Sequence, residues 1–307
     1  MDLNGKRVLV TGATGQVGSA VVRRLAGTCD LWGAARFSKA GSRDKLDARG
    51  VHTAAIDLAS GDLADLPGDF DIVLNFAVTK SADADFDADI AGNAEGVGHL
   101  MRHCASADAF LHCSSTAVYE SAGRSPRKEI DPLGDDHRVF QPTYSISKIA
   151  AEAVARFGAK AFGVRTVIAR LCVPYGDFLG WPFFHLMMVD KSYPVALHTD
   201  RPNLFNLIHL DDIMRTIPAL LDAASVPATI INWAGDEQVS IEDWTAFMGQ
   251  RLGKEPILDY VENALDSVVV DTSKLQSLAG PSTVHWTDGL SQMIDAQQRA
   301  TRARDHA

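Results

Sequence analysis

The amino-acid sequence predicts an α/β protein in which a doubly wound parallel sheet is combined with a smaller α/β unit. Short apolar runs alternate with helix-like runs through the first half of the chain. These apolar runs are nearly continuous, as in strands that are buried on both faces of a parallel sheet. After residue 171 the pattern changes to a region rich in proline and aromatic residues, which indicates a second domain.

The first expected strand, residues 7–10, leads into a helix at 17–25 whose valines and leucine recur on one face. Further strands are expected at 30–35, 54–56, 72–76, 110–113, 165–171, 206–210 and 229–233, and further helices at 91–105, 145–157 and 241–252, the last with Ser240 as its N-cap. We therefore expect one domain of residues 1–171 plus 206–232, and a second of residues 172–205 plus 233–307.

Composition limits the possible partners and the cellular location. The formal net charge of the 307 residues is -10, so nucleic acid and anionic membranes are not expected as partners. The four cysteines are widely separated and form no C-x-x-C pair, so neither a metal site nor a disulfide framework is expected. The sequence contains no signal peptide and no apolar run of membrane-spanning length, so we expect a cytoplasmic protein.

A glycine-rich turn follows the first strand directly and opens the first helix. Glycines there permit a tight turn and a close approach of the backbone to a pyrophosphate, while the helix N-terminus offers free N–H groups to phosphates. A bare flexible turn is the alternative, but the strand before it and the helix after it favour a Rossmann-type dinucleotide site. The residues expected to contact the cofactor are Gly12, Thr14, Gly15, Gln16, Val17 and Gly18.

The spacing T-G-x-x-G-x-x-G in this turn resembles the short-chain dehydrogenase/reductase superfamily, and more closely its extended branch, the NAD-dependent epimerase/dehydratase family. In such proteins the end of the second strand selects the cofactor, and here Arg36 stands there without a carboxylate. A guanidinium favours a 2′-phosphate, so NADP is expected over NAD. The resemblance also places Asp57 and Leu58 against the adenine, and Phe76 and Ala77 beneath the cofactor.

The catalytic residues are expected in a Y-x-x-x-K motif. Tyr144 and Lys148 are four residues apart, so on a helix they share one face. A nearby ammonium lowers the pKa of a phenol, and Tyr144 is then suited to exchange a proton with a carbonyl or hydroxyl. The segment from Ser114 to Tyr119 resembles the family's S-S-x-x-V-Y segment, in which Ser115 takes the place of the hydroxyl that orients the substrate oxygen.

The resemblance continues to the end of the chain. Asn93 and Gly96 match an N-x-x-G helix, and His209 lies in a late H-V-x-D-like motif. Arg170 to Gly176 resembles the strand that leads into the substrate domain, where Leu171 and Val173 would meet the nicotinamide amide. A homodimer through the helix that carries Tyr144 is a further expectation from the family.

The substrate is expected to differ from a nucleotide-sugar. Family members that bind a sugar diphosphate often carry an asparagine where this chain has Val173, and an arginine where it has Phe205. Two apolar residues would leave a diphosphate poorly neutralised, although Arg201 could substitute. The acidic pair of the dehydratases is replaced by Thr116 and Ala117. Six apolar side chains are expected either to line a substrate cleft or to form the core of the second domain: Phe178, Trp181, Phe183, Phe184, Met187 and Met188.

The sequence thus predicts an NAD(P)-dependent oxidoreductase that transfers hydride to or from a carbonyl or secondary alcohol of a small non-nucleotide substrate. One alternative is an epimerase, of sugars or nucleotide-sugars, with a transient keto intermediate and a tightly held cofactor. Another is a non-catalytic NADP-binding redox sensor, which the complete set of Ser115, Tyr144 and Lys148 disfavours.

Overall fold

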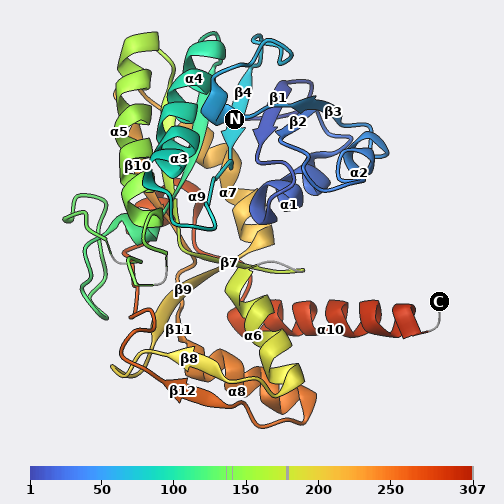
Figure 1. Ribbon diagram of the computed structural model, residues 1–307, viewed down its shortest axis with the longest axis vertical. Helices are drawn as coiled ribbons and strands as arrows, with labels where there is room; N and C mark the ends of the chain where they lie inside the picture. The colour runs from blue at the N-terminus through green and yellow to red at the C-terminus, as the bar shows by residue number, and fades with distance from the viewer. Residues whose placement is uncertain (136, 140, 178–179, 306–307) are drawn as a thin grey trace. The chain divides into compact units, whose positions relative to one another are not determined.

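The computed structural model describes residues 1–135, 137–139, 141–177 and 180–305 (Figure 1). The chain divides into two compact units. Unit 1 consists of Met1–Val118, Leu133–Arg170 and Thr216–Ile231. Unit 2 consists of Tyr119–Pro132, Leu171–Arg215 and Asn232–Ala307.

A seven-stranded sheet forms the centre of unit 1, with the strand order β10-β6-β5-β4-β1-β2-β3. β1 pairs in parallel with β2 and β4, β2 with β3, and β4 with β5. The strands are β1 Arg7–Thr11, β2 Asp30–Ala35, β3 His52–Ala55, β4 Ile72–Asn75, β5 Ala109–Ser115, β6 Thr166–Leu171 and β10 Thr229–Trp233. The order from β3 to β6 is that of a doubly wound nucleotide-binding sheet, which confirms the predicted fold class. The order reverses between β1 and β4, where such sheets bind their ligands.

The helices of unit 1 connect these strands. They are α1 Gln16–Leu25, α2 Asp44–Asp47, α3 Phe86–Ile90, α4 Gly96–His103 and α5 Tyr144–Phe162, with 3-10 turns η1 Leu58–Ser60 and η3 Thr116–Val118 and a π-helical turn η2 Ala91–Glu95. α7 Leu210–Asp222 begins in unit 2 and ends in unit 1. α1 buries Val21, Val22 and Leu25 of the face that the sequence spacing predicts, whereas Val17 is half-buried.

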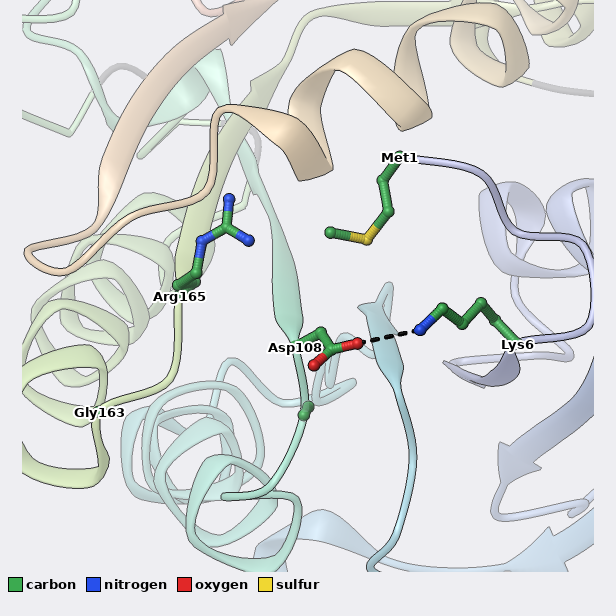
Figure 2. A pocket seen from close by; sticks show the side chains of 6 residues that line it. Met1, Lys6, Asp108, Gly163 and Arg165 are labelled. Carbon is green, nitrogen blue, oxygen red and sulfur yellow. Dashed lines mark hydrogen bonds and ion pairs between the residues drawn. The ribbon is translucent and has the colours of Figure 1, made fainter.

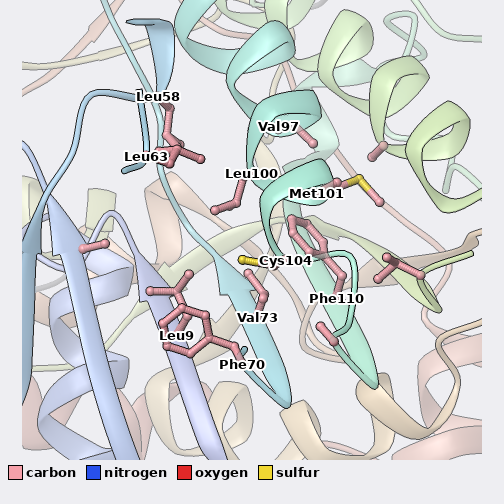
Figure 3. Packing of buried hydrophobic residues seen from close by; sticks show 14 of the residues in the cluster. Leu9, Leu58, Leu63, Phe70, Val73, Val97, Leu100, Met101, Cys104 and Phe110 are labelled. Carbon is pink, nitrogen blue, oxygen red and sulfur yellow. The ribbon is translucent and has the colours of Figure 1, made fainter. Parts of the chain in front are cut away.

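The main core of unit 1 lies between the sheet and α4 with α5. Figure 3 shows Val97, Leu100 and Met101 of α4 near strand residues such as Val73 and Phe110. Leu100, Val73 and Phe110 are fully buried. Because each such side chain contributes about 1.5–3 kcal/mol when it leaves water, this core fixes α4 and α5 firmly on the sheet.

Unit 2 has its own sheets and core. Its strands are β7 Val173–Tyr175, β8 Val195–Leu197, β9 Leu204–His209, β11 Gln238–Ser240 and β12 Leu258–Tyr260, arranged as β11-β9-β7 and β12-β8. Its helices are α6 Gly180–Lys191, α8 Ile241–Leu252, α9 Ser273–Ala279 and α10 Trp286–Asp305. Ser240 caps α8 by accepting a hydrogen bond from the Asp243 amide, as the sequence predicts. Phe205 and Trp244 are among its fully buried residues.

Candidate active site

The glycine turn lies at the sheet's reversal point, between the ends of β1 and β4. Gly12 has a φ of 65°, and a Cβ on it would lie 2.6 Å from the Phe76 carbonyl oxygen, so only glycine fits against the end of β4. A Cβ on Gly18 would lie 2.3 Å from the Gly12 carbonyl oxygen, which explains the close contact of α1 with the turn. Phe76 and Ala77 thus lie directly beside the turn.

The N-terminus of α1 is open to a ligand. Gly15 is its N-cap, and no side chain caps the helix there. Thr14, Gly15 and Gln16 are exposed, whereas Val17 is half-buried. The free N–H groups and the positive end of the helix dipole suit a pyrophosphate. The chemistry and shape of this turn therefore fit a dinucleotide cofactor.

The adenosine end of the expected site is formed by the ends of β2 and β3. Arg36 follows β2 directly and is exposed. Arg43 donates hydrogen bonds to Thr53, and its guanidinium lies over the Phe37 ring. Asp57 caps η1 by accepting from the Ala59 amide at 3.1 Å. Leu58 is buried, and a Cβ on Gly96 would lie 2.8 Å from its Cβ.

The structure brings Ser115, Tyr144 and Lys148 together at the end of β5 and the start of α5. The Ser115 hydroxyl is near enough to the Tyr144 phenol to lower the pKa of Tyr144. Lys148 is buried one turn further along α5, and its Nζ donates to the Cys113 carbonyl oxygen at 2.9 Å. The arrangement presents a phenol, a hydroxyl and an ammonium, which together can orient an oxygen and move a proton.

Burial dominates the pKa of the Tyr144 phenol. It raises the pKa of Tyr144 to about 12, while the hydrogen bond from Ser115 acts in the opposite direction. Burial also lowers the pKa of the Lys148 ammonium, against the attraction of Cys113 and Glu152. The net shift of Tyr144 is upward, which differs from the lowering that the sequence predicts, because burial disfavours the phenolate more than its polar neighbours favour it.

Ser114, the neighbour of Ser115, has a structural role. Its hydroxyl donates to Glu152 Oε1 at 2.6 Å, and the same carboxylate accepts from Arg170 Nε at 2.9 Å and from a second guanidinium nitrogen at 2.7 Å. All three side chains are buried. The Ser114 hydroxyl is therefore occupied by its hydrogen bond to Glu152, whereas Ser115 is half-buried and lies near Tyr144.

A second network of buried polar side chains, in addition to that of Ser114, Glu152 and Arg170, crosses the sheet. Thr11 Oγ1 donates to Asn75 Oδ1 at 2.5 Å, and the Asn75 amide donates to His112 Nδ1 at 3.1 Å. Burial and the Lys148 charge hold the pKa of His112 well below its ordinary value, so the imidazole is neutral. This network links β1, β4 and β5 just beneath the expected cofactor.

Two features next to Tyr144 were not predicted from the sequence. Lys80, in the loop after β4, places its Nζ 4.6 Å from the centroid of the Tyr144 ring. The π-helical turn η2 interrupts the helix that was expected over residues 91–105, and its Asn93 bonds to Thr79 in the same loop. A Cβ on Gly92 would lie 2.3 Å from Thr79 Oγ1, so the small residue at 92 was the one signal of this contact.

The remaining expected residues belong to unit 2. Leu171 ends β6 and Val173 opens β7, and both are buried. Phe205 is 1% exposed and packs edge-on against Trp181 at 5.5 Å. Arg201 stacks over Tyr260. Phe178 lies outside the described residues.

A cavity of about 380 Å³ lies at the opposite edge of the sheet, at the start of β1, β5 and β6 (Figure 2). Lys6 in it pairs with Asp108 at 3.1 Å, and Arg165 donates to the backbone at Ala224 and Asp222. Lys6 and Arg165 thus have partners within the protein. The cavity lies away from the strand ends that carry the glycine turn and Tyr144. Among the described residues, no cluster of three metal-ligating side chains occurs, and no helix is long and apolar enough to cross a membrane.

The chain is similar to known proteins over most of its length. The model of the NAD dependent epimerase/dehydratase family matches residues 8–234. A dTDP-4-dehydro-6-deoxy-D-allose reductase of a Streptomyces species is 24% identical over 97% of this chain and 94% of its own. A dTDP-glucose 4,6-dehydratase of Mycolicibacterium smegmatis is 26% identical over 94% of this chain and 92% of its own.

Solved structures show the same fold. A UDP-glucuronic acid 4-epimerase from Bacillus cereus, in complex with UDP-glucuronic acid and NAD, has a TM-score of 0.81 and 22% identity, covering 95% of this chain and 99% of that one. A UDP-N-acetylglucosamine 4-epimerase from Methanobrevibacter ruminantium has a TM-score of 0.82 and 17% identity, covering 97% and 99%. The chain therefore belongs to the NAD-dependent epimerase/dehydratase family, the extended branch of the short-chain dehydrogenases/reductases, and is an enzyme that works with a nicotinamide cofactor.

Proposed function

We propose that the protein is an NADP(H)-dependent oxidoreductase that interconverts a carbonyl and a secondary alcohol on a small non-nucleotide substrate. The observation that carries this proposal is the grouping of Ser115, Tyr144 and Lys148 at the sheet edge that bears the glycine turn. The nicotinamide, when bound, supplies or accepts the hydride. Ser115 holds the substrate oxygen, and Tyr144 gives that oxygen a proton during reduction or takes one during oxidation.

Lys148 supports this proton transfer by its position on α5. It is one helical turn from Tyr144, so its ammonium lies on the same face as the phenol. Its bond to the Cys113 carbonyl oxygen fixes the ammonium beside β5. A fixed positive charge there stabilises the phenolate that forms when Tyr144 loses its proton, and it is also placed to bind the nicotinamide ribose.

The choice of a non-nucleotide substrate rests on Phe205. Its side chain is part of the apolar core of unit 2, against Trp181 and Trp244, so this position offers no charge to a diphosphate. Arg201, the nearby cation, is stacked on Tyr260. The curated relatives are named for dTDP-sugars, so this protein would differ from them in substrate.

The choice of NADP rests on Arg36. It is the exposed residue that follows β2, and its guanidinium suits a 2′-phosphate. The Bacillus cereus epimerase structure contains NAD, so the proposed preference would set this chain apart from that protein. Calorimetry with NADPH, NADP, NADH and NAD tests it, followed by a carbonyl screen that monitors NADPH oxidation. A preference for the phosphorylated pair and turnover in the screen support the proposal, whereas the absence of binding to all four overturns it.

An epimerase is the second candidate, because the solved structures of similar fold include 4-epimerases. The same Tyr144 and Ser115 would then act on a transient ketone. A cofactor that copurifies at full occupancy and does not exchange would favour this candidate over net oxidation or reduction.

We further propose a cytoplasmic homodimer that associates through α5. Phe157 and Ile146 on this helix are 66% and 38% exposed, so they offer apolar surface to a second copy of the chain. The four cysteines are free thiols, consistent with a reducing compartment. Sedimentation of the native protein and of a Phe157→Glu variant tests the interface, since the variant should be monomeric.

A further inference from the structure

Lys80 is a second lysine at the catalytic tyrosine, and it comes from a different part of unit 1. It lies in the loop between β4 and α3, whereas Tyr144 begins α5. Its ammonium nitrogen is 4.6 Å from the centroid of the Tyr144 ring. Because the face of an aromatic ring carries negative charge, an ammonium in this place is attracted to it.

The residues on both sides of Lys80 are held in place by buried polar side chains. The Thr79 amide donates to Asn93 Oδ1 at 2.7 Å, and Asn93 Nδ2 donates to the Thr79 carbonyl oxygen at 2.9 Å. The Ser81 amide donates to Asp89 Oδ1 at 2.8 Å. Asp89 and Asn93 are 1% and 3% exposed, so these bonds are protected from water.

The same two side chains also hold the first turn of α5. Thr143 Oγ1 donates to Asp89 Oδ2 at 2.5 Å, and Asn93 Nδ2 donates to Ser147 Oγ at 3.0 Å. Asp89 and Asn93 therefore each contact both the loop that carries Lys80 and the helix that carries Tyr144. The hydrogen bonds of Asp89 and Asn93 hold the Lys80 loop and the first turn of α5 next to each other. The distance from the Lys80 ammonium to the Tyr144 ring therefore does not depend on the flexible lysine side chain alone.

We infer that Lys80 stabilises the phenolate of Tyr144 through the face of its ring, so that Tyr144 ionises between two ammonium groups. This inference rests on the proposed role of Tyr144 in proton transfer. A phenolate ring is more negative than a phenol ring, so the attraction of Lys80 grows as the proton leaves. Lys80 thus opposes the effect of burial on Tyr144.

Several other charged or titratable groups face these two residues. Lys148 and Asp89 act on Lys80: burial and the Lys148 charge lower the pKa of the Lys80 ammonium, whereas Asp89 raises it. Ser115 and Cys113 of β5 act on Tyr144. The His137 ring lies 6.0 Å from the Tyr144 ring. A variant at position 80 alters one of these groups and leaves the others in place.

The test measures ionisation directly and does not require a substrate. 3,5-Difluorotyrosine is introduced at position 144, and its ¹⁹F resonance is titrated with and without saturating NADP. In Lys80→Met the ionisation constant at position 144 should fall by about three- to tenfold. Lys80→Arg should stay near the native value, because the charge over the ring is kept. Lys160→Met, which removes a charge at the exposed end of the same helix, should change nothing.

An unchanged titration in Lys80→Met, or an equal shift in Lys160→Met, overturns the inference. A loss of NADP affinity with an unchanged titration also overturns it, and would make Lys80 a cofactor contact instead. The proposed function fails by a different result, namely turnover that survives in Tyr144→Phe.

Discussion

At the scale of single residues, the site combines a deeply placed phenol with polar groups that oppose the effect of its burial. The pKa of Tyr144 is raised to about 12 by burial, and the Ser115 hydrogen bond lowers it. In the proposed mechanism, proton transfer near neutral pH depends on the cations beside the ring, Lys148 and Lys80. A phenol without these partners would stay protonated and inactive as a base.

Removal of the phenolic hydroxyl is the first prediction. Tyr144→Phe should lower turnover by roughly 10²–10⁴-fold, because the proton donor is lost, while the affinity for cofactor stays within about twofold. Steady-state rates and calorimetry on the same preparation provide the measurement. Tyr193→Phe is a matched control, since Tyr193 is 62% exposed. Unchanged turnover in Tyr144→Phe would exclude the mechanism.

Reversal of the charge at the end of β2 is the second prediction. Arg36→Asp should weaken NADPH by about 10–150-fold, which corresponds to the loss of one charge-assisted hydrogen bond, and should weaken NADH far less. Lys45→Asp, on the exposed surface of α2, makes the same change of charge nearby and should affect neither nucleotide. Equal losses for NADPH and NADH in Arg36→Asp would remove Arg36 from the 2′-phosphate role.

The proximity of Tyr144 and Lys148 could be predicted from the sequence, because they are local neighbours on one helix. Ser115 was placed by counting along a motif, and the structure gives the physical reason for preferring it, since Ser114 donates to Glu152. Lys80 could not be predicted in the same way. Its position depends on Asp89 and Asn93, which join segments far apart in the sequence.

At the scale of elements, α5 is anchored by charge as well as by apolar packing. Glu152 on α5 and Arg170 on β6 form a buried ion pair with a nitrogen-to-oxygen distance of 2.7 Å. The two side chains are 3% and 2% exposed. Because a buried charge without its partner is costly, this pair holds α5 in one register against the sheet.

The third prediction follows from this pair. Glu152→Ala should reduce the free energy of unfolding by about 3–5 kcal/mol, because the Arg170 guanidinium stays buried without its carboxylate. The double variant Glu152→Leu/Arg170→Met should recover most of that loss, because two apolar side chains of similar volume need no partner. Urea unfolding followed by circular dichroism measures both. A double variant as unstable as Glu152→Ala would show that packing and not charge is responsible.

Elements with a strong local pattern were predicted closely. The strand at 229–233 and the helix at 241–252 have the bounds that the sequence indicates. Residues 91–105 were expected as one helix, and the π-helical turn within them was not foreseen. The reason is tertiary: Asn93 bonds to Thr79, and Gly92 lies against it, so a contact with another segment decides the local geometry.

At the scale of the whole molecule, the proposed roles are divided between two units. The glycine turn, Arg36 and the catalytic residues belong to unit 1, whereas Phe205 and the aromatic core around it belong to unit 2. Sheet topology follows from the alternation of strands and helices, so the fold was predictable. In the proposed function, substrate choice depends on which apolar side chains of unit 2 are buried in its core and which line a cleft. The sequence left this open because aromatic residues occur in cores and in clefts.

The fourth prediction concerns the response to cofactor. NADP at 100 times its Kd should stabilise the protein by about 2.7 kcal/mol, because it binds only the folded state. Hydrogen exchange should then slow most in the glycine turn and in the loop after β4, near Phe76 and Ala77. Thermal unfolding and exchange mass spectrometry provide the two readouts. Protection confined to unit 2 would contradict the proposed cofactor site.

The division of unit 1 into three chain segments has a consequence for its synthesis on the ribosome. The edge strand β10 of its sheet comes from residues that are translated after all of β1 to β9, and therefore after a long stretch of unit 2. While this stretch emerges, β6 has no β10 beside it and offers an open edge to other nascent chains. The nucleotide-binding half therefore cannot be completed until about residue 231 has left the exit tunnel, so folding of the two halves is interleaved in time.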